Sequence, residues 1–177
     1  NIFAISNAQQ LSANQSIFEK EVNSLYALAN VGFKNYAFLD LTYRSDVSST
    51  LPTLTNQYDY FSAGLSAIIS DMVELPSAID YFKLRASYAE VGNDTDPYQL
   101  SRAANLLTGG FIALSTSAPA DNLKPEQTTS LELGFDTTLF NRVNIDFTYY
   151  KSNSVDQLFR QNVPQGSGIA TKFINGA

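Results

Sequence analysis

The chain has 177 residues, enough for one ordinary domain, and a formal net charge of −6. Hydrophobic residues make up 44% of the sequence, aromatic residues 12% and charged residues only 16%, a balance that suits a sheet with one apolar and one polar face. The acidic balance argues against a nucleic-acid partner, which requires a clustered basic surface. The absence of Cys and His removes disulfides, thiolate and histidine metal sites, and the commonest general base. We therefore predict no enzyme activity, no metal site and no cofactor.

Two features of the sequence concern membranes and the extent of the chain. No segment approaches about 18 consecutive apolar residues, so the sequence contains no transmembrane helix. No signal peptide is visible after Asn1, and the sequence ends at Ala177 where a new segment starts. We therefore expect the chain to be a piece of a longer protein.

The first half of the chain is predicted to form four β-strands. Residues 1–20 are polar and are expected to form a loop with one helical turn. After them, apolar and polar residues alternate, which is the pattern of a strand with one apolar and one polar face. The four alternating segments lie at residues 23–33, 36–44, 58–70 and 81–92. A short turn, a polar loop and a modest turn connect them in that order.

The longest connection spans residues 93–127 and contains Pro97 and the pair Gly109-Gly110. A connection of this length is usually functional or disordered. Its first residues, 93–96 (NDTD), resemble the start of a calcium loop but lack the Gly and the distal Glu of that motif. We therefore interpret them as turn residues just beyond the end of a strand.

The clearest signal in the sequence is a β-hairpin. Apolar residues occupy alternate positions over residues 131–139, with a break at Thr137, and again over residues 143–149, with polar or small residues between them. A turn of three residues, 140–142, joins the two arms and contains an Asn, a residue that favours tight turns. Each arm has roughly the 10 residues that a tilted strand needs to cross a bilayer.

With the remaining elements, the connections between predicted strands alternate between short and long along the whole chain. The second arm of the hairpin is expected to continue to Phe159, residues 161–167 form a loop, and a seventh strand is predicted over residues 169–174. Connections are thus short and long in turn, as in outer-membrane barrels with short periplasmic turns and long extracellular loops. Soluble Greek-key sandwiches have less regular connections. We therefore predict an all-β fold, an antiparallel transmembrane β-barrel segment, and keep a soluble secreted β-sandwich that binds carbohydrate as the alternative.

Three stretches of the sequence carry a resemblance to a known family. They are GFKNYAFLDLTYRSDVSSTLP at residues 32–52, YFKLRASYAEVGND at residues 81–94, and DNLKPEQTTSLELGFDTTLFNRVNIDFTYYKSNSVDQLF at residues 121–159. In this order and spacing they resemble the barrel of SusC/RagA-type TonB-dependent outer-membrane transporters. The resemblance runs from about Ser24 to Ile174.

The resemblance implies a fold, a location and a set of partners. It implies a barrel of roughly 22 strands, closed by an N-terminal plug domain, in the lipid of the outer membrane of a Gram-negative bacterium. It further implies active import of a glycan or oligopeptide substrate, a SusD-like surface lipoprotein as lid, and energy from the TonB complex. No plug domain, TonB box or closing C-terminal strands are visible in the sequence, so residues 1–177 are expected to supply about six to seven strands of the barrel.

Five charged residues are expected on the polar face of the predicted sheet. If the apolar face meets lipid, the polar face lines the lumen of the barrel. There Lys83 and Arg85 would lie beside Glu132 and Asp136, with Asp146 on the next strand. These residues could contact the plug or the substrate, or they could form a ladder of ion pairs that keeps the wall rigid, each exposed pair contributing about 0–1 kcal/mol. We favour the ladder.

The tyrosines form the last group of candidates. Six of them lie near predicted strand ends and are expected to form interfacial girdles: Tyr36, Tyr58, Tyr60, Tyr81, Tyr149 and Tyr150. Tyr98 lies instead in the long connection, where the sequence leaves open whether it is a stacking platform for a sugar ring.

Overall fold

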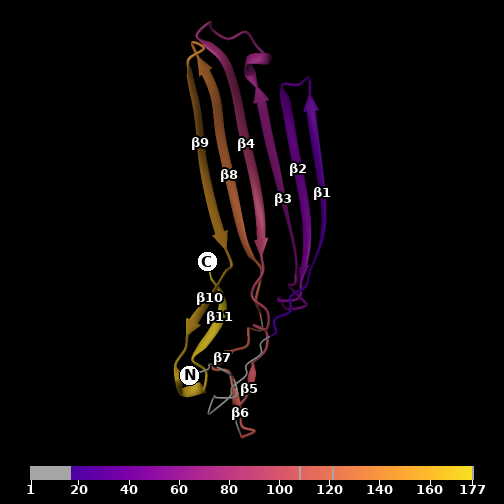
Figure 1. The fold of residues 1–177 in the computed structure, drawn as a ribbon, viewed down its shortest axis with the longest axis vertical. Helices are drawn as coiled ribbons and strands as arrows, with labels where there is room; N and C mark the ends of the chain where they lie inside the picture. Colours follow the sequence, from indigo (N-terminus) through magenta and orange to yellow (C-terminus); the bar gives the residue numbers. More distant parts are fainter. Residues whose placement is uncertain (1–16, 108, 121, 177) are drawn as a thin grey trace, which may run out of the picture.

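The structure is a computed structural model that describes residues 17–107, 109–120 and 122–176. Its largest element is an open antiparallel sheet of six strands in the order β1-β2-β3-β4-β8-β9 (Figure 1). The strands are β1 (Val22–Phe33), β2 (Ala37–Ser48), β3 (Gln57–Ile68), β4 (Ile79–Asn93), β8 (Glu126–Leu139) and β9 (Val143–Val155). This confirms the six strands predicted from the alternation. The helical turn expected in residues 1–20 falls largely on residues 1–16, which lie outside the described residues.

The five short strands gather at the end of the sheet where the long connections lie, the lower end in Figure 1. There β10 (Gln157–Asn162), β11 (Thr171–Gly176) and β7 (Ser117–Ala118) form a three-stranded sheet, while β5 (Ala104–Leu106) and β6 (Ile112–Leu114) form a hairpin. Two 3-10 helices, η2 (Ile69–Asp71) and η3 (Gln165–Ser167), complete the elements. Across the described residues, the structure shows no helix of the length and apolarity that a membrane crossing requires.

Two predictions about the connections need correction. The long connection was predicted as loop, but it contains three short strands, β5, β6 and β7. The sixth predicted strand does not run unbroken to Phe159, because it ends at Val155 and β10 begins two residues later. Asp156 separates them with a left-handed backbone (φ 53°), and this bend redirects the chain out of the large sheet.

The short turns at the other end of the sheet are tight and share a backbone form. Lys34-Asn35 and Phe140-Asn141 all have positive φ, which lets adjacent antiparallel strands pair up to a turn of three residues. Asp80 holds the second turn, because its carboxylate accepts hydrogen bonds from the backbone N–H of Asn141 (2.6 Å) and from the Asn141 side chain (3.0 Å).

The strand register places most apolar residues of the six strands on one face, which we call the apolar face. Each strand supplies four or five such positions, or roughly 20–27 Å of strand, the length of the apolar band of a membrane barrel. We call this band the belt. Toward the long connections the belt ends at a row of polar residues: Ser45, Asp59, Glu90, Thr129 and Lys151.

No second layer covers the apolar face in the part of the chain that the structure describes. Leu133 is 47% exposed and Phe147 is 54% exposed, although each lies near the middle of its strand, β8 or β9. A soluble sandwich would bury these side chains against a facing sheet about 10 Å away. The open single layer therefore speaks against the sandwich alternative.

The buried core lies outside the belt, where the long connections fold over the ends of β2, β3 and β4. It consists of Leu51, Tyr58, Ala120 and Leu123, and we call it the loop core. Gly92 on β4 is required beside it, because a Cβ at that position would lie 2.4 Å from the ring of Tyr58. The loop core thus fixes the long connections to the wall of the sheet.

Candidate functional site: a charged centre on the polar face

The polar face carries hydrogen bonds between side chains across neighbouring strands. Thr42 and Ser62 join β2 to β3, and Ser130 and Ser152 join β8 to β9. Such pairs keep hydroxyl groups of an exposed strand face partnered and fix the register. The face opposite the belt is therefore suited to contact with water or with a polar ligand.

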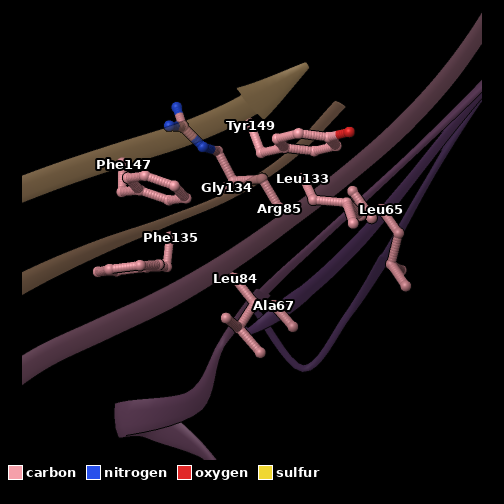
Figure 2. Close-up of a pocket in the computed structure, with 10 residues that line it drawn as sticks. Leu65, Ala67, Leu84, Arg85, Leu133, Gly134, Phe135, Phe147 and Tyr149 are labelled. Atoms are coloured by element: carbon pink, nitrogen blue, oxygen red, sulfur yellow. The ribbon is translucent and has the colours of Figure 1, made fainter. Parts of the chain in front are cut away.

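Arg85 is the centre of the charges on this face. It lies on β4 directly opposite Gly134 on β8, which in turn lies opposite Thr148 on β9. A Cβ at Gly134 would come within 3.1 Å of the guanidinium of Arg85 and 2.9 Å of the backbone oxygen of Phe147. The missing side chain of Gly134 therefore gives Arg85 room to lie across β8 and reach β9, as Figure 2 shows.

The guanidinium of Arg85 makes three polar contacts beyond Gly134. It donates hydrogen bonds to Asp146 (2.7 Å) and to the hydroxyl of Thr148 (2.9 Å). The carboxylate of Asp136 lies 3.3 Å away but its near oxygen accepts no hydrogen bond, so this contact is a charge interaction only. One cation thus links strands β4, β8 and β9.

Lys83 and Glu132 lie on the same face but outside this cluster. Lys83 is directly opposite Asp136 in the register, yet the two form no ion pair within the described residues. Glu132 lies opposite Ser87 and Tyr150 and likewise forms no ion pair there. The structure therefore brings three of the five predicted charges together and leaves two free to meet another molecule.

A shallow hollow with a volume of about 230 Å³ lies beside Arg85. Gly64 and Gly134 leave room for it. Its polar lining consists of the hydroxyl groups of Ser66, Ser87 and Thr148 and the carboxylates of Asp40 and Glu132. Asp40 was not among the predicted site residues, although its alternation on β2 places it on the polar face. The hollow can accept a polar group between one cation and two carboxylates.

A second polar cluster lies beyond the end of the belt that faces the long connections, next to the loop core. Asp46 is only 3% exposed, and its carboxylate accepts hydrogen bonds from Arg44 (2.8 Å) and Tyr60 (2.8 Å). Burial alone would raise the pKa of Asp46, but these hydrogen bonds and one from Ser24 outweigh it and lower the pKa. Burial, followed by the charges of Asp94 and Asp46, raises the pKa of Tyr58 to about 12. This cluster therefore holds its carboxylate ionised and its phenol neutral.

The turn that resembled a calcium loop belongs to this second cluster. Asp94 forms an ion pair with Lys20 and accepts a hydrogen bond from Ser48. Both partners are consistent with a structural carboxylate that ties the long connection to the start of β1. Among the residues that the structure describes, no group of three or more acidic side chains could hold a metal ion.

The girdle prediction is wrong for Tyr58 and Tyr60, whereas Tyr149 lies on the apolar face at the end of the belt, where the girdle stays a prediction. The last apolar-face position before the polar row is aromatic on four strands: Tyr43, Phe61, Tyr88 and Tyr149. Such a row is typical of the membrane interface of a barrel. Tyr58 and Tyr60 point to the other face and pack in and against the loop core.

Tyr98 lies in the long connection with an unusual backbone, φ 64°. Its hydroxyl accepts a hydrogen bond from the backbone N–H of Glu19 (3.2 Å), and its ring lies 6.4 Å from that of Phe18. The side chain remains 53% exposed and borders a hollow of about 500 Å³ with Ser49 and Thr50. Tyr98 is thus held in place while about half of its side chain stays exposed.

Comparison with known proteins gives the family of the chain. The family model described as "TonB dependent receptor-like, beta-barrel" matches residues 2–176. The TonB-dependent receptor P3 of Formosa agariphila is 29% identical over 170 residues, which cover 89% of this chain and 17% of the relative. The chain therefore spans about a sixth of the length of that relative.

Solved structures show the same fold. A structure of the RagAB peptide transporter matches with a TM-score of 0.75 at 22% identity, covering 88% of this chain and 18% of the transporter chain. The siderophore receptor PirA from Pseudomonas aeruginosa matches with a TM-score of 0.61 at 17% identity, covering 89% of this chain and 29% of that receptor. These matches confirm the resemblance drawn from the sequence and the all-β barrel fold. The chain belongs to the TonB-dependent receptor β-barrel family.

Proposed function

We propose that the chain is part of the barrel wall of a SusC/RagA-type transporter that imports a glycan or oligopeptide across the outer membrane of a Gram-negative bacterium. The import is powered by the TonB complex, which acts through a plug domain in the lumen. In this role the wall holds a pathway open and binds cargo, and its residues break no bond. Membership of the family and the presence of a belt with an aromatic row support the proposal.

The observation that carries the proposal is the contrast between the two faces of the sheet. The apolar face has the length and aromatic border of a lipid-facing band, while the polar face carries the centre at Arg85. Lumen residues of barrels alternate with lipid-facing residues along each strand. Arg85, Asp136 and Asp146 therefore brace the lumen wall, and Lys83 and Glu132 are the charges available to the plug or the cargo.

The long connections are the parts of the chain best placed to meet a partner outside the membrane. The β5–β6 hairpin exposes a set of large apolar side chains along its length: Leu106, Leu107, Phe111, Ile112 and Leu114. Exposed apolar clusters of this kind mark protein contacts. We assign the hairpin to contact with a SusD-like surface lipoprotein, and Tyr98 to contact with cargo at the entrance.

Growth and uptake in the source bacterium test the transport function. Deletion of the receptor gene is expected to abolish uptake of one labelled glycan or oligopeptide class, and a protonophore is expected to stop that uptake in cells with the intact gene. A panel of labelled oligosaccharides and peptides identifies the class. Unchanged uptake of every member of the panel after deletion would overturn the proposal.

Charge reversal separates bracing residues from binding residues in the same assay. Arg85→Glu is expected to weaken the barrel but to leave uptake per assembled receptor unchanged, because Arg85 acts within the wall. Lys83→Glu is the matched variant on the same strand and face, and it is expected to lower uptake without affecting assembly. Loss of uptake by an assembled Arg85→Glu receptor would instead place Arg85 in the binding surface.

A further inference from the structure

A groove crosses the apolar face inside the belt. Its volume is about 570 Å³, and Figure 2 shows the side chains around it. The walls are formed by large side chains, and the floor by two alanines: Leu65, Leu84, Leu133, Phe135, Phe147 and Tyr149 around Ala67 and Ala86. Arg85 and Gly134 contribute only from the sheet itself, because their side-chain positions face the other way.

The groove continues toward the polar row that ends the belt. A second apolar hollow of about 210 Å³ adjoins it, shares Leu65 and Ala86 with it, and extends to Tyr88 and Leu131. Ala86 is central to both hollows, because it lies between Leu65 on β3 and Leu133 on β8 in the register. The two hollows thus form one channel along the surface, open on its outer side.

The far end of the channel lies beside an unpaired cation. Three charged residues stand in the polar row, and two of them are acids held by tyrosines: Asp59 accepts a hydrogen bond from Tyr43, and Glu90 from Tyr88. Lys151 is the third, directly opposite Leu131 at the end of the channel. Among the described residues it has no ion-pair or hydrogen-bond partner.

We propose that this channel holds one acyl chain of an anionic lipid of the outer leaflet, with a phosphate of its headgroup beside Lys151. A groove in a lipid-facing wall loses dispersion energy unless a flexible apolar chain fills it. A basic residue at the membrane surface attracts an anionic headgroup. One amphiphile satisfies both ends of the channel, whereas a second copy of the protein would leave Lys151 without an anion. The inference rests on the proposed function for the membrane placement of the belt.

Native mass spectrometry of the whole receptor in detergent, with synthetic diphosphorylated lipid A as the probe, tests the proposal. Lys151→Gln is expected to weaken lipid retention about fivefold, as for the loss of one basic residue at an anionic surface. Ala86→Leu is expected to weaken it about tenfold, because its side chain displaces about two methylene groups of the lipid. Lys83→Gln, which removes a lysine from the polar face, is the matched control and is expected to retain lipid like the unchanged receptor.

The outcomes separate the alternatives. Dephosphorylated lipid A is expected to bind equally well to the Lys151→Gln and unchanged receptors, since the phosphate is the group that Lys151 contacts. Equal retention of diphosphorylated lipid A by all variants would overturn the proposal, and so would a loss of receptor dimers with Ala86→Leu and no loss of lipid. Heat-modifiable migration of each variant shows that its barrel is folded. Failure of the unchanged receptor to insert into vesicles would refute the membrane placement instead.

Discussion

The belt and the loop core use the same kinds of side chain in opposite ways. In the belt, leucines and phenylalanines of every strand lie on the outer surface, and Phe147 is 54% exposed. In the loop core, Leu123 is 2% exposed and packs with Leu51, Tyr58 and Ala120. The difference follows from the medium around each region. Lipid tails are as apolar as leucine, so apolar side chains that face lipid gain no hydrophobic free energy from burial inside the protein.

The comparison also explains where polar groups are buried. The polar face of the sheet leaves Asp146 68% exposed on its side chain, so Arg85 pairs with it in a wet environment. Next to the loop core, Asp46 is almost fully covered, and two donors hold its carboxylate. A region that buries apolar residues against each other also buries polar groups, and must then provide their partners.

The largest expected effect comes from the same substitution made in both regions. Leu123→Ala is expected to lower the local opening free energy of the long connections by about 2–5 kcal/mol, because it leaves a cavity in the loop core. Leu133→Ala in the belt is expected to cost less than about 1 kcal/mol, since a lipid chain fills the space. Native-state hydrogen exchange of the receptor in lipid nanodiscs measures both values. Equal losses would contradict the difference between the regions.

An introduced charge is expected to reverse that order. Phe135→Arg, in the middle of the belt on β8, is expected to destabilise the barrel by about 2–4 kcal/mol, the cost of a cation near the bilayer midplane. Glu132→Arg, three positions earlier on the polar face, is expected to change stability by about 0.5 kcal/mol or less. Denaturant unfolding from lipid vesicles measures both. A cost for Glu132→Arg as large as for Phe135→Arg would show that the polar face does not meet water.

The belt could be predicted from the sequence, but the loop core could not. Strands β8 and β9 follow a clear alternation, interrupted on β8 at Thr137, and that local pattern alone decides which side chains share a face. The loop core depends on contacts between Leu51 and Leu123, which are far apart in sequence. Strands β5, β6 and β7 have two or three residues each, too few for any period to be visible. The sequence therefore predicted the faces but not the packing of the connections.

The charged centre shows the same limit at the scale of single residues. The alternation correctly places Lys83 and Arg85 on one face with Asp136. Which lysine or arginine finds a partner depends on the space beside it, and Gly134 provides that space only for Arg85. A glycine opposite an arginine in a strand pair is the signal that could have found the cluster. It becomes readable only when the register of the two strands is known.

The close packing at Gly134 predicts a loss of stability of intermediate size. Gly134→Ala is expected to destabilise the barrel by about 1–3 kcal/mol, because the new Cβ lies 2.9 Å from the backbone oxygen of Phe147, which cannot rotate away. Gly64→Ala is the control on the same face, where the nearest atom is the Cβ of Asp40 at 3.8 Å. It is expected to change stability by less than about 1 kcal/mol. Thermal unfolding of the two variant receptors in detergent measures both changes. Equal losses of stability would show that the loss of a glycine, and not the close packing at position 134, destabilises the barrel.

The smallest expected effect is the coupling between Arg85 and Asp146. A double-mutant cycle with Arg85→Ala and Asp146→Ala is expected to give about 0–1 kcal/mol, because the pair is exposed to water and pays side-chain entropy to form. The coupling is expected to shrink as salt rises, since screening acts on exposed charges. A coupling well above this range that persists in high salt would mean that the lumen around Arg85 excludes water. In that case the plug would have to cover the polar face as closely as the long connections cover Asp46.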